Sequence, residues 1–528
     1  MTVWLLKVWK LTAIAAVGLA LATPASSETF RWAAQTDVLS VDPQSSGDTQ
    51  TRNFMRNVYE RLTDLDGDMK VGPRLATKWE LVNPTTWRFT LRPVVVFHDG
   101  SPFTADDVVF SFNRGNSANS DVKSRLRPIK SISKIDDLTV EVITQAPNPT
   151  LLIDLVFLEI YSKSWAEKHD SVEPVSMASG KANYASRNAN GTGPVRVVDY
   201  QPGVKVVLAP NDKWWGEKKH NLTEAIFTPI GAEATRVAAL LSGQVHLISP
   251  LPRQDVARIK SNPNLMALEG PESRVVYFGL DQLSPELQYS NIKGKNPFKD
   301  IRVRRAFYQA IDTDLVRDRI MNGAALSAAT LLTASSLGND PLATQRFPYD
   351  PEASKRLLAE AGYPNGFEVT LDCTVGRVVN DEKICQAVAA MLARVGVKVD
   401  VFSVPSNLYF PKLSKRETSF FIGSWGSDPD PQPLMMMLMH SMKGDGAGMY
   451  NAGGYDSPKV DALISEIAKE MDPEKRQAMI KEAARIHRED VAVIPLHQQT
   501  LAWGIRKGVT VRQRADDYLD LNSVRVTR

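Results

Sequence analysis

The 528-residue sequence has little cysteine and little histidine, and it lacks the short motifs that mark common active sites. Its seven histidines are scattered and form no His-Glu-x-x-His pair, which argues against a zinc peptidase of that type. It has no Gly-x-Ser-x-Gly elbow and no Gly-Lys-Ser/Thr phosphate loop. We therefore expect no enzyme and no cofactor. A hydrolase with an unfamiliar site stays open, because active sites are recognised by geometry.

The sequence also lacks a clear excess of positive or negative charge. Lys and Arg number 63 against 60 Asp and Glu, which argues against nucleic acid or an anionic membrane as the main partner. The composition is 43% hydrophobic and 23% charged, as in an ordinary globular protein with a sizeable core. The length indicates two to four domains or lobes.

Long apolar runs are absent except at the start, where residues 1–27 read as a secretory signal peptide. Lys7 and Lys10 precede the apolar stretch Leu11–Ala22, and small residues follow up to Ser27. The alternative is an uncleaved membrane anchor, but the stretch is short of the roughly 20 residues that span a bilayer. Because no cysteine follows it, we expect no lipid anchor. The sequence predicts a soluble periplasmic protein.

The only two cysteines, Cys373 and Cys385, lie twelve positions apart. In an exported protein such a pair favours a disulfide, since the compartment is oxidising. In the chain-entropy treatment, closing so short a loop stabilises the fold by about 3 kcal/mol. The alternative is two small buried hydrophobic side chains.

Strand and helix signals alternate irregularly along the sequence. β-rich or alternating segments predict strands at residues 31–34 and 86–92, and a hairpin formed by 195–198 and 204–208. Capping residues predict helices that begin after Thr104, Asp300, Asp350 and Asp472, and the segment Asp456-Ser-Pro458 predicts another helix start. Such a pattern, without a regular βαβ period, is typical of an α+β or mixed α/β protein with discontinuous lobes.

A methionine-rich run covers residues 435–442. Thioethers and imidazole could hold Cu(I), haem or a nickel chelate. However, Met435, Met439 and Met442 recur at helical spacing on one face. Because methionine fills cores and adaptable pockets, packing or pocket lining is favoured over metal binding.

Residues 91–114, LRPVVVFHDGSPFTADDVVFSFNR, closely resemble the signature of the family 5 solute-binding proteins of ABC importers, the peptide/nickel type. Further segments resemble the same family in the expected order: 41–43, 59–62, 191–194, 211–216, 298–312, 425–428 and 494–497. The resemblance covers almost all of the chain after residue 27.

The resemblance implies a bilobal clamshell of mixed α/β class with three nested domains. Domain I would comprise residues 28–72, 192–289 and 497–528. Domain II would be inserted at 73–191, and domain III would cover 290–496. The ligand would lie between domains I and III, and hinge closure would precede delivery to a permease and ATPase complex in the inner membrane. We expect a monomer.

The segment Trp425-Gly-Ser-Asp428 carries the first candidate ligand residues. The resemblance implies that Asp428 pairs with the α-ammonium of a peptide, and a buried ammonium does need a carboxylate. Trp425 could offer its face to the ligand. The alternative for Asp428 is a turn-capping role before Pro429.

Three weaker candidates complete the predicted site. Arg377 lies where dipeptide-binding relatives place an arginine for the ligand carboxylate, which a planar guanidinium can hold with two parallel hydrogen bonds. A surface ion pair is its alternative. Gln44 and Ser45 lie where the first lobe of such proteins approaches the ligand.

The leading hypothesis is thus a periplasmic binding protein for dipeptides or short oligopeptides. A second hypothesis keeps the fold and replaces the ligand by an opine, a sugar, glutathione, or a nickel or haem chelate, since fold does not fix ligand. A third, from another class, is an enzyme or chaperone on the same scaffold.

Overall fold

The computed structural model describes residues 28–46, 48–176, 181–375, 377–426, 429–444 and 446–527. The predicted signal peptide, residues 1–27, and the candidate ligand residue Asp428 lie outside these ranges. Within them, no helix combines the length and the apolar character that crossing a membrane requires.

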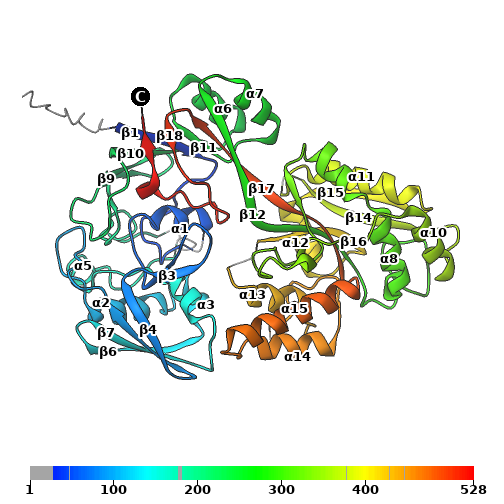
Figure 1. Ribbon diagram of the computed structural model, residues 1–528, viewed down its shortest axis with the longest axis horizontal. Helices are drawn as coiled ribbons and strands as arrows, with labels where there is room; N and C mark the ends of the chain where they lie inside the picture. The colour runs from blue at the N-terminus through cyan, green and yellow to red at the C-terminus, as the bar shows by residue number, and fades with distance from the viewer. Residues whose placement is uncertain are drawn as a thin grey trace, which may run out of the picture.

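Two long antiparallel strands connect two lobes (Figure 1). They are β12 (Leu265–Leu280) and β17 (Val493–Arg506). The first part of β12 packs into the core of the N-terminal lobe, whereas its last part, from Val276, packs into the core of the other lobe. The start of β17 packs into the core of the second lobe, and its last part packs into the core of the first lobe. The chain therefore crosses between the lobes near 271–275 and again near 498–500.

The first lobe continues the sheet to which these strands belong. β1 (Glu28–Ala34) runs parallel to β10 (Leu222–Pro229) and β11 (Leu247–Ser249), and β11 pairs antiparallel with β17. β8 (Val195–Gln201) and β9 (Lys205–Pro210) form the predicted hairpin at the sheet edge. The helices of this lobe are α1 (Thr49–Met55), α6 (Glu233–Ser242) and α7 (Val256–Ser261).

A subdomain with its own core is inserted into the first lobe. Its antiparallel sheet has the order β4-β5-β7-β6, with β4 (Ala76–Asn83), β5 (Thr86–Leu91), β6 (Ile129–Asp136) and β7 (Thr139–Thr144). Helix α2 (Ala105–Gly115) buries its apolar face in the same core.

The chain returns to the first lobe through two glycines that allow a close backbone approach. A Cβ at Gly191 would lie 2.0 Å from the carbonyl oxygen of Val58, and one at Gly193 would lie 2.4 Å from that of Asn57. Any side chain there would force the two segments apart, which explains the Gly-Thr-Gly-Pro sequence at 191–194.

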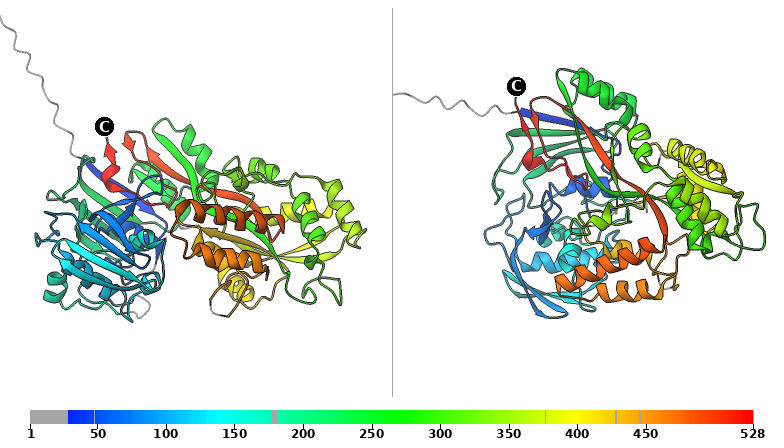
Figure 2. Two further views of the ribbon diagram at one scale, coloured as in Figure 1. Left: turned by 60° about the horizontal axis from the view of Figure 1, so that its bottom comes forward. Right: turned by 45° about the vertical axis from the view of Figure 1, so that its right-hand side comes forward.

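The second lobe contains the other end of the sheet. β14 (Glu368–Val375) runs parallel to β15 (Lys398–Pro405) and β16 (Phe420–Gly426), and β16 pairs antiparallel with β12. Helices pack around these strands, and α14 and α15 lie side by side (Figure 2). They are α8 (Ile301–Ala310), α10 (Pro351–Glu360), α11 (Asp381–Ala393), α14 (Pro458–Ile467) and α15 (Pro473–Glu489).

The predicted helix starts agree with the structure. Asp300, Asp350 and Asp472 each accept a hydrogen bond from a backbone N–H in the first turn of α8, α10 and α15. At the start of α2, the Asp107 carboxylate accepts from the backbone N–H of Thr104 at 2.8 Å. These interactions satisfy helix N–H groups that would otherwise lack partners.

A disulfide joins Cys373 on β14 to Cys385 on α11, with 6.5 Å between their Cα atoms, as the sequence favoured.

The architecture as a whole is a mixed α/β fold of two lobes, one of which carries an inserted subdomain, in agreement with the predicted fold class. The shorter elements are β2 (Thr63–Leu65), β3 (Val71–Pro73), α3 (Lys123–Leu126), α4 (Leu151–Asp154), α5 (Lys163–Lys168), α9 (Thr313–Leu315), β13 (Ala325–Ser327), α12 (Ser406–Ser414), α13 (Gln432–Leu434), β18 (Val509–Thr510) and β19 (Arg525–Val526).

Candidate ligand-binding cleft

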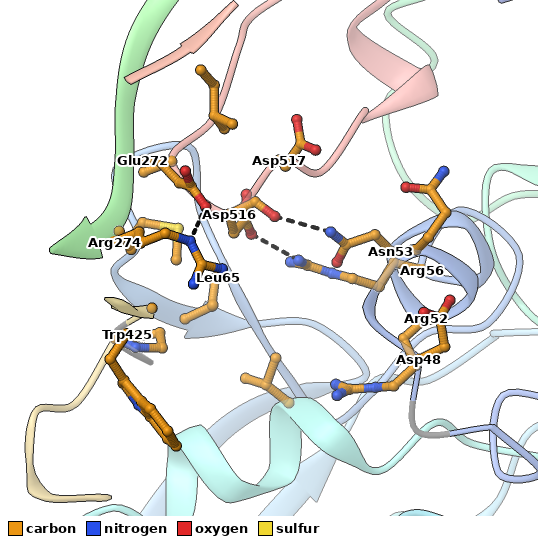
Figure 3. A pocket seen from close by; sticks show the side chains of 18 of the residues that line it. Asp48, Arg52, Asn53, Arg56, Leu65, Glu272, Arg274, Trp425, Asp516 and Asp517 are labelled. Atoms are coloured by element: carbon orange, nitrogen blue, oxygen red, sulfur yellow. Dashed lines mark hydrogen bonds and ion pairs between the residues drawn. The ribbon is translucent and has the colours of Figure 1, made fainter. Parts of the chain in front are cut away.

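A cleft of about 630 Å³ lies between the lobes, beside the two connecting strands (Figure 3). Its volume is in the range of small-molecule binding sites. One wall comes from α1 and the segment 515–517 of the first lobe. The other comes from the end of β16 and the start of the segment after β14 in the second lobe.

The connecting strands supply charged residues to the cleft because their pairing is interrupted there. The register of β12 against β17 shifts between Pro271 and Val275, and Glu272, Ser273 and Arg274 line the cleft at this irregularity. Arg274 Nε donates to Glu272 at 2.9 Å, so these two charges compensate each other. β-bulges commonly re-aim side chains next to binding sites.

The first-lobe wall contains a compensated arginine, Arg56. Its guanidinium donates to Asp64 at 2.9 Å and to Asp516 at 2.8 Å. Asp516 also accepts from Arg514 at 2.9 Å. The arginines lower the pKa of Asp516 to about 2 against the opposing effect of burial.

Arg52, on the same wall, has no carboxylate partner among the described residues. Figure 3 shows its side chain extending from α1 into the cleft. The guanidinium lies over the Phe157 ring, 4.3 Å from the centroid. Its Nε is buried without a hydrogen-bond acceptor. Burial is the largest cause that lowers its pKa to about 10, with neighbouring arginines adding to the shift and Glu159 opposing it.

Trp425 and Arg377, two of the residues predicted from sequence, both line the second-lobe wall. Trp425 is partly buried on β16, with its ring 4.9 Å from that of Tyr450. The backbone N–H of Arg377 donates to Asp381 at 3.0 Å, while its guanidinium has no ion-pair partner among the described residues. The Arg377 side chain is exposed at the surface of the cleft; partial loss of solvent and the charge of Arg274 lower its pKa, and the charge of Glu272 opposes the shift.

A second cavity, of about 430 Å³, adjoins the cleft on the second lobe. It shares Arg377, Ser424 and Trp425 with the cleft, and is otherwise mainly apolar. Its aromatic and methionine side chains are Tyr277, Tyr409, Phe410, Tyr450, Met442 and Met449. We call it the apolar chamber.

The methionine-rich run contributes to this chamber and to the core beneath it. Met435 and Met439 are fully buried in an apolar cluster, and Met442 lines the chamber. In the described part of the chain, no group of three His, Cys, Asp or Glu side chains is placed to hold a metal ion. Met442 Sδ also accepts a hydrogen bond from Arg416 in the chamber.

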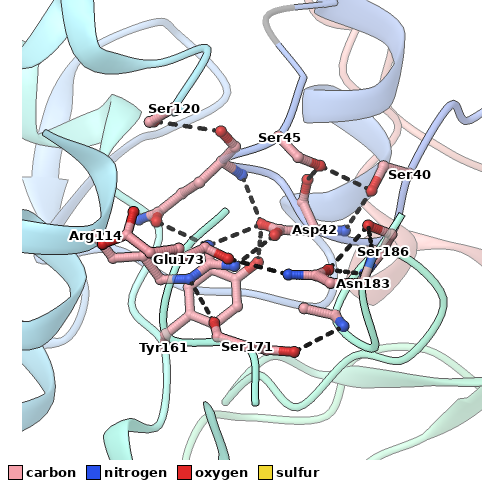
Figure 4. A network of polar contacts seen from close by, with 12 residues as sticks. Ser40, Asp42, Ser45, Arg114, Ser120, Tyr161, Ser171, Glu173, Asn183 and Ser186 are labelled. Carbon is pink, nitrogen blue, oxygen red and sulfur yellow. Dashed lines mark hydrogen bonds and ion pairs between the residues drawn. The ribbon is translucent and has the colours of Figure 1, made fainter. Parts of the chain in front are cut away.

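Gln44 and Ser45 are not in the cleft, contrary to what the sequence predicted for them. Both are fully buried where the first lobe meets the inserted subdomain. Gln44 Oε1 accepts from Arg114 at 3.0 Å, and Ser45 Oγ donates to the carbonyl of Asp42 at 2.9 Å (Figure 4). Since protein groups occupy their polar atoms, these side chains present none to a ligand in this conformation.

A half-buried carboxyl that sequence reasoning missed lies at the end of the first-lobe wall. Asp517 accepts from Trp503 Nε1 at 2.7 Å and from Ser249 Oγ at 3.3 Å. Burial raises its pKa to about 7, reinforced by the nearby charges of Glu272 and Asp516. No sequence signal marks Arg52, Glu272 or Asp517 as cleft residues, because they meet only through tertiary packing.

Comparison with known proteins identifies relatives over most of the chain. Residues 70–483 match the profile of the bacterial extracellular solute-binding proteins, family 5 Middle. Heme-binding protein A of Haemophilus influenzae is 28% identical over 471 residues, covering 84% of this chain and 81% of that protein. The dipeptide-binding protein of Escherichia coli K12 is 28% identical over 481 residues, covering 86% and 85%. Among solved structures, HbpA2 from Haemophilus parasuis has a TM-score of 0.81 at 25% identity, covering 95% of this chain and 100% of that one.

Proposed function

Because this chain belongs to the family 5 bacterial extracellular solute-binding proteins, we propose that it captures dipeptides or short oligopeptides between its lobes and delivers them to an ABC permease and its ATPase. The family consists of substrate-binding transport proteins, so the prediction that the chain is not an enzyme is confirmed. The three domains with the boundaries predicted from sequence are part of this proposal.

The peptide proposal rests on the position of Arg377, which lines both the charged cleft and the apolar chamber. A peptide has the matching chemistry, with a carboxylate for the guanidinium and an apolar side chain for the chamber. Trp425 lies at the same junction. We assign the ligand's ammonium to Asp428, three residues farther along, because a buried ammonium needs a carboxylate.

Thermal unfolding of the protein with candidate ligands tests the proposal. Saturation with a peptide at a hundredfold excess over Kd stabilises the native state by about 2.7 kcal/mol. The proposal fails if dipeptides and oligopeptides leave the unfolding temperature unchanged while an opine, a sugar, glutathione, or a nickel or haem chelate raises it. The variant Arg377→Gln should lose the response to peptides. Arg356→Gln, on the exposed face of α10 in the same lobe, is the matched control.

We further propose export through the signal peptide 1–27, cleavage after Ala25 or Ser27, and a freely diffusing periplasmic monomer without a lipid anchor. Mass spectrometry of protein from a periplasmic extract should give a chain that begins at Ser26 or Glu28. Detection of the uncleaved chain in the membrane fraction would contradict this. Size-exclusion chromatography with light scattering checks the oligomeric state, since a monomer without the signal peptide has a mass slightly below the 58.4 kDa of the full chain.

A further inference from the structure

The two walls of the cleft each present an arginine whose guanidinium forms no ion pair with a carboxylate in the described part of the chain. Arg52 projects from the first lobe and Arg377 from the second, and both line the same cavity. Of the other arginines that line the cleft, Arg274 pairs with Glu272 and Arg56 with two aspartates, and Arg125 lies over the same Phe157 ring as Arg52.

Two carboxylates that line the cleft with Arg52 are engaged elsewhere. Asp48 caps α1 by accepting from the backbone N–H of Thr51 at 2.8 Å. Asp516 is held between Arg56 and Arg514. Glu159 is fully buried, and its charge favours the charged form of Arg52, but neither of its carboxylate oxygens accepts a hydrogen bond from Arg52 or from any other group in the described structure. The guanidinium of Arg52 is left against an aromatic ring, which compensates a charge far less than a carboxylate does.

Closure of the lobes would remove water from both guanidinium groups, which is unfavourable for a charge without a paired carboxylate, and like charges on facing walls repel each other as the lobes approach. A ligand with one anionic group would compensate one of the two. A ligand with two anionic groups would compensate both, and its binding energy would then favour closure of the lobes upon it.

We propose that the preferred ligand carries two carboxylates, one bound by Arg377 and the other by Arg52, so that Arg52 selects acidic peptides over neutral ones. The inference rests on the proposed peptide-binding function and adds the charge class of the ligand. Guanidinium groups suit this role because their paired N–H donors match the geometry of a carboxylate.

Matched acid and amide peptides test the proposal on the intact protein, because glutamate and glutamine side chains differ in charge but hardly in size. Isothermal titration calorimetry at pH 7.5 compares Ala-Glu with Ala-Gln, Glu-Ala with Gln-Ala, and Ala-Glu-Ala with Ala-Gln-Ala. In at least one pair the acidic peptide should bind at least about tenfold more tightly, as expected for hydrogen bonds to a charged group. Arg52→Gln should abolish this preference while amide-peptide affinity stays within about threefold. Arg258→Gln, an exposed arginine of α7, should retain it.

The outcomes separate this inference from the function on which it rests. Equal affinity for acid and amide peptides in the unaltered protein overturns the inference and leaves peptide binding intact. A preference that persists in Arg52→Gln overturns the assignment of Arg52. If no peptide of either kind binds, the proposed function itself fails, and the inference fails with it. If Arg52→Gln does not fold, the comparison of acid and amide peptides on the unaltered protein still decides whether acidic peptides are preferred.

Discussion

Replacement of Asp42 by asparagine should destabilise the contact between the first lobe and the inserted subdomain. Asp42 and Arg114 are both fully buried, and the two side chains are joined by hydrogen bonds of 2.6 and 3.1 Å. Asp42 Oδ1 also accepts from the hydroxyl of Tyr161 and from the backbone N–H of Gln44. An asparagine oxygen can keep these neutral partners, but its amide nitrogen then faces the donors of Arg114.

The expected loss follows from the charge that remains. Removing one member of a buried ion pair leaves the other charge uncompensated, which costs about 3–5 kcal/mol. Exposed pairs contribute only about 0–1 kcal/mol. Asp68, exposed and paired with Arg512, therefore provides the matched control Asp68→Asn.

Urea unfolding followed by tryptophan fluorescence measures both variants. Asp42→Asn should lower the free energy of unfolding by about 3 kcal/mol or more, and Asp68→Asn by less than about 1 kcal/mol. The double variant Asp42→Asn with Arg114→Met should be less destabilised than the sum of its single variants, because it leaves no lone charge. A loss below about 1 kcal/mol for Asp42→Asn would refute the reasoning.

Three further predictions concern the second lobe and the cleft. Arg377→Gln should weaken binding of a cognate peptide by about 2–5 kcal/mol, measured by calorimetry, and equal affinity would remove Arg377 from the site. Cys373→Ser should lower the free energy of unfolding by about 3 kcal/mol and weaken ligand binding, since the disulfide holds the segment before Arg377; no change in either would contradict this. Asp517→Asn should flatten the pH dependence of stability. Because the folded-state pKa of Asp517 is raised to about 7, the stabilisation that it gives the folded state is fully present below its ordinary pKa near 4 and is lost as the pH rises towards 7. An unchanged pH profile of the unfolding temperature would count against that assignment.

Local structure was predictable from sequence where the signal is local. The caps at Asp300, Asp350 and Asp472 were identified because a capping side chain contacts backbone within three residues. The hairpin of β8 and β9 was identified from two alternating runs around a Pro-Gly turn.

The long-range arrangement was not predictable from sequence patterns alone. Nothing in the two segments says that β12 pairs with β17, more than two hundred residues later, or that their register shifts at Glu272. Sequence pattern and family resemblance together pointed to Trp425 and Arg377, and both residues line the cleft. They failed for Gln44 and Ser45, because only the packing of the inserted subdomain shows that these residues are covered.

Arg52 illustrates the same limit. In the sequence it is an ordinary arginine of the short helix α1, with Arg56 directly after the helix, and its exceptional property is the absence of an ion-paired carboxylate. That property depends on Phe157 and Asp516, which are distant in the chain and are brought together by three separate segments.

The central claim, that a peptide is captured between the lobes, is tested most directly by fluorescence energy transfer across the cleft. One dye is placed at Lys78 on the inserted subdomain and the other at Lys459 on α14, both at exposed positions. A peptide that stabilises the protein should increase transfer as the lobes close, and Arg377→Gln should abolish the increase at the same peptide concentration. Peptide binding without any change in energy transfer would contradict the account. So would an equal increase in transfer for Arg377→Gln and the unaltered protein, measured at a peptide concentration that saturates neither of them.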